Sequence, residues 1–546
     1  MKRRKVVSAR PRPAELYETL FRQHNAPSSV PTVGPNRRHA LAYHRPLLLH
    51  GDAGKSGRDA LLAWFDSKST ARKMPWRKPW LDPANTPRET LERRAYEVWI
   101  SEIMLQQTRV AVVIDYWNRW MDKWPTIHDL AAAEADEVLS AWRGLGYYSR
   151  ARRIHEAAGV VVGDKVWKGL LPSDTKELES RVPGVGPYTA GAIASIVFGR
   201  AVPMVDGNVL RVLSRQLGIY GNVKTDKAVI DLMWAAADAL VKAAAADHAA
   251  EDGDPGAERV SDVPGRWGQA LMELGSTLCT PKPDCGACPV SATCHAYNEG
   301  LARAREPAGM NGGALKDELG DIEDACTLCE PFEEVDDDEE PPRGGKRVSQ
   351  SAKNGATRMK EESPPVDGKS NDVASPAELS VAIEHARRFP LKVIKKAVRE
   401  EETVVCAIRR ADGRFLLHRR PEKGLLAGLW EMPSHTLSSA DPGKPAKRKG
   451  AAVGYLDRLY KAEHAGMGEA PRHVRDLGAV PWLFSHLKLT MHVHLFTVSG
   501  GDEGAKGCTD DGGVWRWADS EEVEGESMGT GMRKCWALVK EASEDC

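Results

Sequence analysis

The fold of the N-terminal half of the chain is indicated most clearly by the stretch Val182-Pro-Gly-Val-Gly-Pro187. It lies between a helical segment around Leu178 and an apolar helix that starts Tyr188-Thr-Ala-Gly-Ala-Ile193. The two glycines permit a tight turn, and the final proline suits the first position of a helix. Such a helix-hairpin-helix can hold one DNA phosphate through the backbone around Gly184 and Gly186 without reading sequence. Taken alone, a Gly-Pro turn between helices is usually only a turn.

Residues 46–300 have the pattern of an all-α domain. From about Gly57 to Tyr297 apolar residues recur at helical spacing, with almost no strand-like alternation. Glycine and proline interruptions divide this region into roughly ten helices. A polar interruption at residues 246–264 is typical of an extended surface loop.

The remaining segments differ in composition. Residues 1–45 are rich in Pro, Arg and polar residues, which predicts a basic and mostly disordered tail. Residues 301–400 lose periodicity and predict a largely disordered connector that is first acidic and then basic. From residue 401 short β-like runs appear, such as Thr403-Val-Val-Cys-Ala-Ile408 and the run from Leu487 to Val498. Residues 401–546 are therefore predicted to form an α+β domain.

The overall charge is a poor guide to the partners of this chain. Its 76 Lys and Arg residues nearly balance its 77 Asp and Glu residues, for a net charge of −1. Between Asp317 and Glu340, however, there are 13 acidic residues and no basic residue, so the rest of the chain carries +12. Because such a charge block is typical of a solvated connector, near-neutrality does not exclude nucleic acid as a partner.

The chain has no apolar run close to the roughly 20 residues that span a bilayer, so no membrane contact is expected. Its start, Met1-Lys-Arg-Arg-Lys5, lacks the apolar core of a secretion signal. This basic run predicts a location in the nucleus, with the mitochondrion as a possible second site, and a solvated tail is an equal alternative. A monomer is expected.

Four cysteines follow the helical region in the array Cys279-x5-Cys285-x2-Cys288-x5-Cys294. Four closely spaced thiols can surround one soft cation or cluster, which favours zinc or a [4Fe–4S] cluster. Structural zinc more often uses two CxxC pairs, whereas one central CxxC with a flanking Cys on each side suits a cubane cluster. The roles we expect for the metal are to fold a basic surface for phosphate and to sense redox state, and not to carry out hydrolysis.

Two carboxylates are candidates for acid–base chemistry. Glu102 lies among apolar residues of Trp99-Ile-Ser-Glu-Ile-Met104, where burial would raise its pKa and let it act as an acid. Asp206, in Val205-Asp-Gly-Asn-Val209, lies at the edge of an apolar segment. The simpler alternatives are a solvent-facing helix Glu and a helix-capping Asp.

The hairpin, Asp206 and the four-cysteine array, in this order, resemble the helix-hairpin-helix DNA glycosylase superfamily and, within it, the MutY-type adenine glycosylases. The resemblance is carried by these stretches: Trp99-Ile-Ser-Glu-Ile-Met-Leu-Gln-Gln-Thr-Arg109, Gly144-Leu-Gly-Tyr-Tyr-Ser-Arg150, residues 182–193 and Asp206-Gly-Asn-Val209. It implies a base-excision-repair enzyme that acts on double-stranded DNA, flips out adenine mispaired with 8-oxoguanine or guanine, and removes it. It also implies a [4Fe–4S] cluster, although the first gap between the cysteines holds five residues where the family usually has six.

The resemblance assigns roles to the polar residues. It implies that Glu102 protonates the departing adenine and that Asp206 stabilises or transiently captures the sugar cation, with Tyr188 and Asn208 as supporting groups. Related glycosylase-lyases carry a lysine where this chain has Tyr188, and a phenol cannot form a Schiff base. The resemblance therefore implies a monofunctional glycosylase that leaves an abasic site.

Further residues are implied to contact DNA. They fill the space left by the flipped base, hold the opposite base or line the adenine pocket: Trp76, Arg77, Gln106, Gln107, Tyr147 and Gln269. The cluster of Arg150, Arg152 and Arg153 is a natural phosphate contact, and a solvated helix face is the alternative.

The stretches Gly424-Leu-Leu-Ala-Gly-Leu-Trp-Glu-Met-Pro433 and Phe484-Ser-His-Leu-Lys-Leu-Thr490 resemble the Nudix-like domain that completes the MutY family. A catalytic Nudix hydrolase needs a helix dense in Glu, and no such run follows Pro433. We therefore expect this domain to bind without hydrolysing. The resemblance implies that Phe484, Ser485 and His486 inspect 8-oxoguanine; a plain strand entry is the alternative.

The connector contains a second candidate metal site. Eukaryotic family members bind zinc here with three Cys and an upstream His, and this chain offers Cys326, Cys329 and His44. Because no third Cys lies nearby, an acidic residue would have to complete the site, and the sequence does not favour zinc there. The surrounding acidic run is expected to contact repair or replication proteins.

Two other hypotheses remain. The first is another helix-hairpin-helix enzyme, such as a thymine glycosylase or a lyase, which the Nudix-like domain and Tyr188 argue against. The second is a non-catalytic DNA-damage-binding protein on the same scaffold. The presence of both Glu102 and Asp206 argues against lost catalysis.

Overall fold

The computed structural model divides the chain into two compact units. The first comprises residues 1–68, 201–257 and 266–393, and the second comprises residues 69–200, 258–265 and 394–546. The boundary therefore passes through the helical region. The residues that the structure describes are 17, 20–21, 37, 39–69, 72–248, 260–305, 326–332, 374–393, 398–421, 424, 426–437, 445–462, 469–484, 487–499, 506–508 and 514–544.

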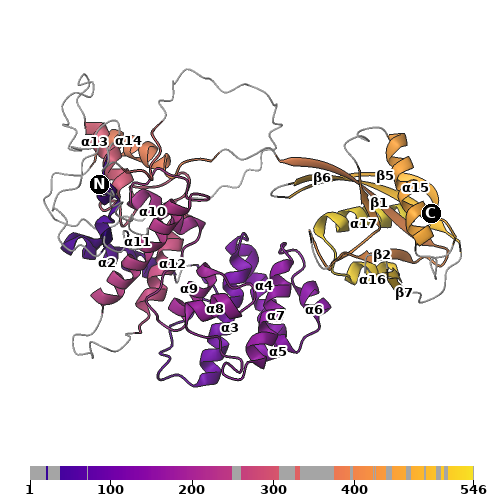
Figure 1. The fold of residues 1–546 in the computed structure, drawn as a ribbon, viewed down its shortest axis with the longest axis horizontal. Helices are drawn as coiled ribbons and strands as arrows, with labels where there is room; N and C mark the ends of the chain where they lie inside the picture. Colours follow the sequence, from indigo (N-terminus) through magenta and orange to yellow (C-terminus); the bar gives the residue numbers. More distant parts are fainter. Residues whose placement is uncertain are drawn as a thin grey trace, which may run out of the picture. The chain divides into compact units, whose positions relative to one another are not determined.

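The first unit is helical (Figure 1). Its helix α10 packs against α11 and α13, and α13 packs against α14. Both α10 and α11 begin after an aspartate, Asp206 and Asp226, whose side chain accepts hydrogen bonds from the first backbone N–H groups. The elements are η1 (Leu41–His44), η2 (Leu47–Leu49), α2 (Gly51–Ser69), α10 (Gly207–Gln216), α11 (Lys227–Asp247), α12 (Val263–Thr277), α13 (His295–Arg305) and α14 (Pro376–Arg387).

Helix α14 corrects the prediction for the connector. Residues 376–387 are helical because Ser375 and Glu378 form a reciprocal capping box and a proline occupies the first turn. The helix packs closely on α13, where a Cβ at Gly300 would lie 2.6 Å from the Cα of Ala382. The prediction of irregular structure was therefore wrong for this segment. Residues 306–325 and 333–373 lie outside the described residues.

Two helices of the second unit contain a segment that is buried on nearly all sides, residues 94–104 in one and 189–196 in the other. These are α3 and α9, which pack against each other, while α4 packs on α3 and α8 on α9. A helix that is apolar all round belongs in the interior, which explains the absence of a polar stripe around Trp99 and Ile193. The elements are α3 (Arg88–Leu105), α4 (Val110–Lys123), α5 (Ile127–Ala131), α6 (Ala135–Ala141), α7 (Ser149–Gly163), α8 (Thr175–Arg181) and α9 (Pro187–Ile196).

The C-terminal part of the second unit is a mixed sheet with helices, as predicted. Among the described residues the strand order is β5-β6-β1-β2-β8-β7, with β3 on β2 and β4 on β1. The predicted run 403–408 lies in β1 and the predicted run 487–498 forms β6; β1 pairs antiparallel with β2 and parallel with β6. The elements are β1 (Arg399–Arg410), β2 (Phe415–Arg419), β3 (Trp430–Glu431), β4 (Ser434–Thr436), α15 (Pro445–Ala462), β5 (Arg472–Leu483), β6 (Leu487–Val498), β7 (Lys506–Cys508), β8 (Val514–Ala518), α16 (Ser520–Gly525) and α17 (Thr530–Glu544).

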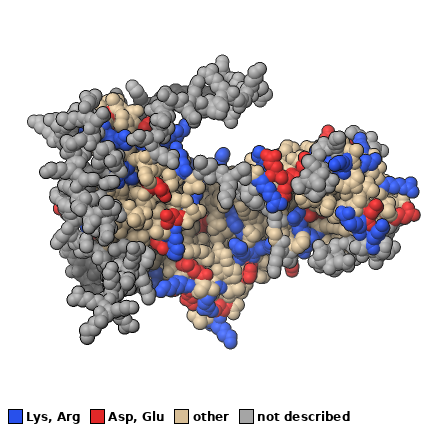
Figure 2. Space-filling view, turned by 45° about the horizontal axis from the view of Figure 1, so that its top comes forward, with Lys and Arg blue, Asp and Glu red and all other residues tan. Residues whose placement is uncertain are grey.

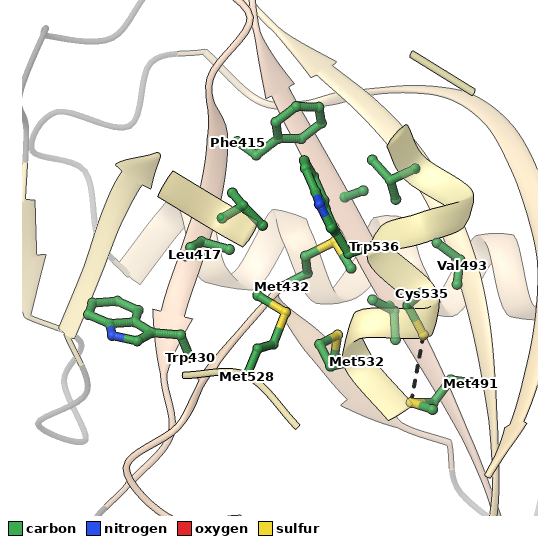
Figure 3. Close-up of a cluster of buried hydrophobic side chains, with 14 of the residues drawn as sticks. Phe415, Leu417, Trp430, Met432, Met491, Val493, Met528, Met532, Cys535 and Trp536 are labelled. Carbon is green, nitrogen blue, oxygen red and sulfur yellow. Dashed lines mark hydrogen bonds between the residues drawn. The ribbon is translucent and has the colours of Figure 1, made fainter. Parts of the chain in front are cut away.

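This sheet carries an apolar core on each face. Alternate residues of β1 point to opposite sides, so Val405 packs with the residues of α17 and Val404 with those of α15. Figure 3 shows the α17 side, where Trp536 packs at right angles to Phe415. The pattern accounts for the continuous apolar run of β1, which is buried on both faces. In the described part of the chain, no helix has the length and apolar character needed to cross a membrane.

Candidate functional site

The packing of α3 against α9 brings two predicted site residues together. The hydroxyl of Tyr188, in the first turn of α9, donates a hydrogen bond of 2.5 Å to Oε2 of Glu102. The residue Glu102 is only 5% exposed. Of the two interpretations of Glu102, the solvent-facing helix residue is therefore wrong. A buried carboxyl group that touches a phenol can take part in proton transfer.

Asp206 belongs to the first unit and caps helix α10. Its Oδ1 accepts hydrogen bonds from the backbone N–H groups of Asn208 and Val209, at 2.9 and 2.8 Å, and its Oδ2 accepts one from the side chain of Asn208 at 2.8 Å. The amide of Asn208 is oriented in turn by Arg211, which donates to its oxygen at 2.9 Å. The capping interpretation is confirmed. The N–H groups at a helix N-terminus carry positive partial charge, and a capping carboxylate there can also act electrostatically on a nearby cation.

The hairpin between α8 and α9 requires glycine for a steric reason. Gly184 has φ +78°, and a Cβ there would lie 2.9 Å from the Cβ of Arg153. Gly186 is the N-cap of α9 and has extended backbone, and Pro187 occupies the first helical position. The exposed turn therefore presents the N-terminus of a buried helix, the end that attracts anions.

Arg150 corrects a prediction. We expected it to contact DNA phosphate, but it is buried and its guanidinium donates to backbone carbonyl groups. These include the oxygens of Ile103 and Gln106, at 2.8 and 2.7 Å, and that of Gly146 at 3.2 Å. Arg150 thus ties the end of α3 to the 144–147 loop. Arg153, in contrast, is exposed as expected.

The two loops held by Arg150 carry three of the predicted DNA contacts. Gln106 is half-buried, whereas Gln107 and Tyr147 are exposed and have positive φ angles of 57° and 48°. Left-handed backbone is uncommon for residues other than glycine and is frequent at functional sites. Tyr147 is 48% exposed, and the Cζ atom of the Arg150 guanidinium lies over its ring, 5.5 Å from the ring centroid.

The residues predicted to line the adenine pocket are divided between the units. In the second unit, Trp76 is buried against Trp117 and its carbonyl accepts a hydrogen bond from Arg94. Arg77 beside it is half-buried. Gln269 is half-buried on α12, within the first unit.

The four cysteines of the predicted cluster line one small cavity. The short first gap therefore does not prevent the four thiols from converging. Burial raises the pKa of both Cys285 and Cys288 to about 12, so a bound cation would be needed to hold these groups as thiolates. The donor set fits a [4Fe–4S] cluster. The lining also includes Arg215, whose Nη1 donates to Sγ of Cys279 at 3.2 Å.

A second group of metal ligands lies elsewhere in the first unit, formed by His39, His44, Cys326 and Cys329. One ligand atom from each lies within 4.8 Å of all the others. Three of these residues were identified from the sequence, which did not favour zinc because an acidic residue would have been needed as the fourth ligand; the structure places His39 there instead. The signal that was missed is the pair of histidines five residues apart, a spacing found in zinc sites.

The hydrogen bonds of these histidines show why a cation fits between them. Nδ1 of His39 contacts the carbonyl oxygen of Arg37 at 2.5 Å, and Nδ1 of His44 contacts that of Leu217 at 2.8 Å. A carbonyl can only accept, so both Nδ1 atoms carry the proton and both Nε2 atoms present lone pairs. These Nε2 atoms are 2.9 Å apart. Two facing lone pairs at this distance repel unless a proton or a metal ion lies between them.

The loop between β5 and β6, which the resemblance assigned to 8-oxoguanine and which we call the recognition loop for that prediction, is described only in part. Phe484 follows the last residue of β5, and its N–H donates to the carbonyl of Leu487 at 2.8 Å. Ser485 and His486 lie outside the described residues. Leu483, next to them, is 69% exposed and lines a groove with Trp482 and the strand segments 399–402 and 488–490.

Comparisons with known proteins agree with this architecture. The family of HhH-GPD superfamily base excision DNA repair proteins matches residues 100–237, and the NUDIX domain family matches residues 404–538. The adenine DNA glycosylase of Homo sapiens is 35% identical over 489 residues, which cover 88% of this chain and 74% of the human protein. That of Mus musculus is 34% identical, with 94% and 84% covered, and that of Schizosaccharomyces pombe is 31% identical, with 80% of each covered.

These matches extend over both the helical region and the sheet domain, and they confirm the resemblance drawn from the hairpin and the cysteine array. They also show an enzyme rather than a non-catalytic binding protein, because the relatives are N-glycosylases. The structure holds Glu102 buried against Tyr188, Asp206 as a helix cap and the hairpin at the start of α9, the residues that the resemblance had assigned to such a reaction. The chain therefore belongs to the adenine DNA glycosylases, the base-excision-repair enzymes that remove adenine from DNA.

Proposed function

We propose that this enzyme removes adenine paired with 8-oxoguanine, or with guanine, by hydrolysis alone and leaves an abasic site. The observation that carries the proposal is the hydrogen bond from Tyr188 to Glu102. The residue in the first turn of α9 is a phenol that is already committed to a carboxylate, so it offers no amine to attack the sugar.

The proposed chemistry divides between the two carboxyl groups. The acid form of Glu102 gives its proton to the departing adenine, the C–N bond breaks with its electron pair going to the base, and an oxocarbenium sugar remains. The carboxylate of Asp206, held by two backbone N–H groups and Asn208, stabilises that positive charge until water adds to the sugar and gives its proton to Glu102, which restores the acid. The target adenine must first leave the stack, and Gln106, Gln107 and Tyr147 are proposed to occupy the vacated space.

We propose two metal centres with structural roles. Cys279, Cys285, Cys288 and Cys294 would hold a [4Fe–4S] cluster, which shapes the surface after α12. His39, His44, Cys326 and Cys329 would hold Zn²⁺ in a closed four-ligand site that joins the N-terminal segment to residues 326–332. Neither set of ligands leaves an open position, so neither metal would act on the substrate.

The sheet domain is proposed to read the base opposite the adenine through Phe484, Ser485 and His486. The support is the place of Phe484 at the end of the long β5–β6 hairpin, beside the groove and the exposed Leu483. We further propose that the protein works in the nucleus as a monomer, and that the acidic part of the connector contacts repair or replication proteins. The basic start of the chain supports the first point, and imaging a fusion with and without residues 1–5 would test it.

A single-turnover assay tests the main proposal. Wild type should release adenine from a duplex with adenine opposite 8-oxoguanine, and Glu102→Gln and Asp206→Asn should not. Sodium borohydride should trap no covalent protein–DNA adduct. Efficient trapping would contradict a hydrolysis-only enzyme, and undiminished release by either variant would contradict the role of that carboxylate.

A further inference from the structure

Helix α15 covers one face of the C-terminal sheet and presents a strongly basic outer side. Its buried residues Ala452, Leu456 and Tyr460 pack on the core beside Val404. The helix carries five basic residues and one acidic residue, Asp457. The basic residues are Lys447, Arg448, Lys449, Arg458 and Lys461.

Three of these residues form a stripe opposite the buried side. Arg458 and Lys461 follow Lys447 by 11 and 14 residues, which is close to three and four full helical turns. The three side chains therefore project in nearly one direction. All three are exposed. Within the part of the chain that the structure describes, no acidic side chain pairs with any of them. We call these three residues the α15 basic stripe. Figure 2 shows Lys and Arg side chains at several places on one face of the molecule, interspersed with Asp and Glu.

The first turn of α15 lies toward the end of the sheet that carries the recognition loop. Arg448 donates to the carboxylate of Glu402 at 3.1 Å. In β1, Glu402 lies opposite Thr490 and Arg399 lies opposite Leu487, the first described residue after the loop. Three residues of strand span about 10 Å, or about three base-pair steps of 3.4 Å, so Glu402, which Arg448 contacts, lies about that far along β1 from that end of the sheet.

In a Nudix hydrolase the helix after this part of the sheet must be dense in Glu to hold Mg²⁺ for a pyrophosphate. Here the helix offers Lys and Arg instead, which attract phosphate without a metal. We propose that the α15 basic stripe binds the phosphate backbone of double-stranded DNA that flanks the lesion, without reading sequence. The proposal rests on the proposed function of the sheet domain, and it adds a surface that anchors the domain on the duplex.

A DNA backbone fits this surface better than an acidic protein would. The stripe is about 21 Å long, which matches several phosphates of a duplex, and the residues between its members on the same helix face, Gly450, Ala451 and Gly454, are too small to anchor a protein interface. The basic side chains remain solvated and on flexible stems, as is common where a regular chain of phosphates is tracked and not a single group.

The test compares two triple variants with the same change in charge. Lys447→Ala/Arg458→Ala/Lys461→Ala removes the stripe. The control, Lys227→Ala/Lys242→Ala/Lys540→Ala, removes three exposed lysines that each pair with a carboxylate. Binding to a 30-base-pair duplex would be followed by fluorescence anisotropy at several salt concentrations. The slope of log K against log [salt] is negative, and each lost phosphate contact reduces its magnitude by about 0.9.

In the stripe variant the magnitude of this slope should fall by about two to three, on lesion and undamaged duplex alike, while the control keeps the wild-type slope. An unchanged slope in a variant that keeps the wild-type melting temperature would overturn the proposal and leave an acidic protein as the partner. The rate of adenine release at saturating enzyme should stay as in wild type. Failure of the proposed function would appear separately, as wild type that binds with the full salt slope but releases no adenine opposite 8-oxoguanine.

Discussion

Tyr188 and Glu102 are 86 residues apart in the chain, yet the phenol of one donates to the buried carboxylate of the other at 2.5 Å. The packing of α3 on α9 makes this pair, and it joins the helix that begins at the hairpin to the proposed general acid. The orientation of the acid therefore depends on the position of the hairpin that is proposed to meet DNA phosphate.

Substituting Tyr188→Phe should slow adenine release by about 10- to 100-fold. A hydrogen bond to a charged group contributes roughly 1.5–3 kcal/mol, and each 1.4 kcal/mol of barrier is tenfold in rate. Single-turnover rates would measure the effect, and DNA affinity should change little. Tyr116→Phe is the matched control, because that phenol donates to the carbonyl of Arg143 instead. Equal slowing in both variants would show that the effect is not specific to Glu102.

The substitution Arg150→Lys should destabilise the protein by about 2 kcal/mol or more. An ammonium group cannot reproduce a fork that reaches several carbonyls, which would leave buried acceptors unpaired. Thermal unfolding would measure the loss, and hydrogen exchange should become faster at residues 104–107 and 145–148. The exposed Arg153→Lys serves as the control. A wild-type melting temperature for Arg150→Lys would show that the carbonyl contacts contribute little.

Metal analysis should find one zinc ion per chain in wild type and none in His39→Ala, with iron unchanged in both. A closed site with three remaining ligands binds zinc far more weakly. His248→Ala, which removes an exposed histidine that contacts Asp59, should keep the zinc. Full zinc content in His39→Ala would mean that another group completes the site.

Replacing Cys288→Ser should remove the visible absorption of the iron–sulfur cluster and the iron, while zinc stays bound. The reason is that Cys288 is one of four thiols around a single cavity. Cys546→Ser provides a control for loss of one thiol. Iron retained at the wild-type level would contradict the assignment of the four cysteines.

Stability should depend on pH through Glu299. Burial alone would raise the pKa of this carboxyl, but hydrogen bonds from His385 and Arg37 outweigh it and hold the pKa at about 2. Because the folded pKa is depressed, the stabilisation is complete above the unfolded value of about 4.5 and is lost as pH falls toward 2. At full strength it is on the order of 3 kcal/mol.

The difference in unfolding free energy between wild type and Glu299→Gln should therefore be large at pH 6 and shrink as the pH falls below 4.5. Urea unfolding at a series of pH values would measure it. Glu384→Gln, at an exposed pair with Arg387, should show no such dependence. A constant difference for Glu299→Gln would mean that the carboxyl charge contributes nothing.

Reading of the base opposite the adenine should weaken in Phe484→Ala/Ser485→Ala. We expect the rate on adenine opposite 8-oxoguanine to fall more than the rate on adenine opposite guanine, because these side chains are proposed to recognise the oxidised base. Parallel single-turnover assays would compare the two duplexes. Val474→Ala, exposed elsewhere on β5, is the control. An equal fall on both duplexes would contradict the recognition role.

The helical and sheet classes of the two halves of the chain, the hairpin and the cysteine array could all be predicted from the sequence. These features are local: apolar spacing, a Gly-Pro turn and four thiols within 16 residues are visible to any reader of the chain. The family relationship followed from the same short stretches. A role that depends only on neighbours in sequence, such as the cap at Asp206, could be predicted for the same reason.

Only the tertiary structure decided which distant groups meet. The contact between Tyr188 and Glu102, the buried fork of Arg150 and the fourth ligand His39 all join segments that lie far apart in sequence. Arg150 looked like a surface charge because three arginines cluster on α7, and the packing of one helix face turned it inward. A charge is placed by the carbonyls and ligands that the fold brings to it, and single-chain spacing does not contain that information.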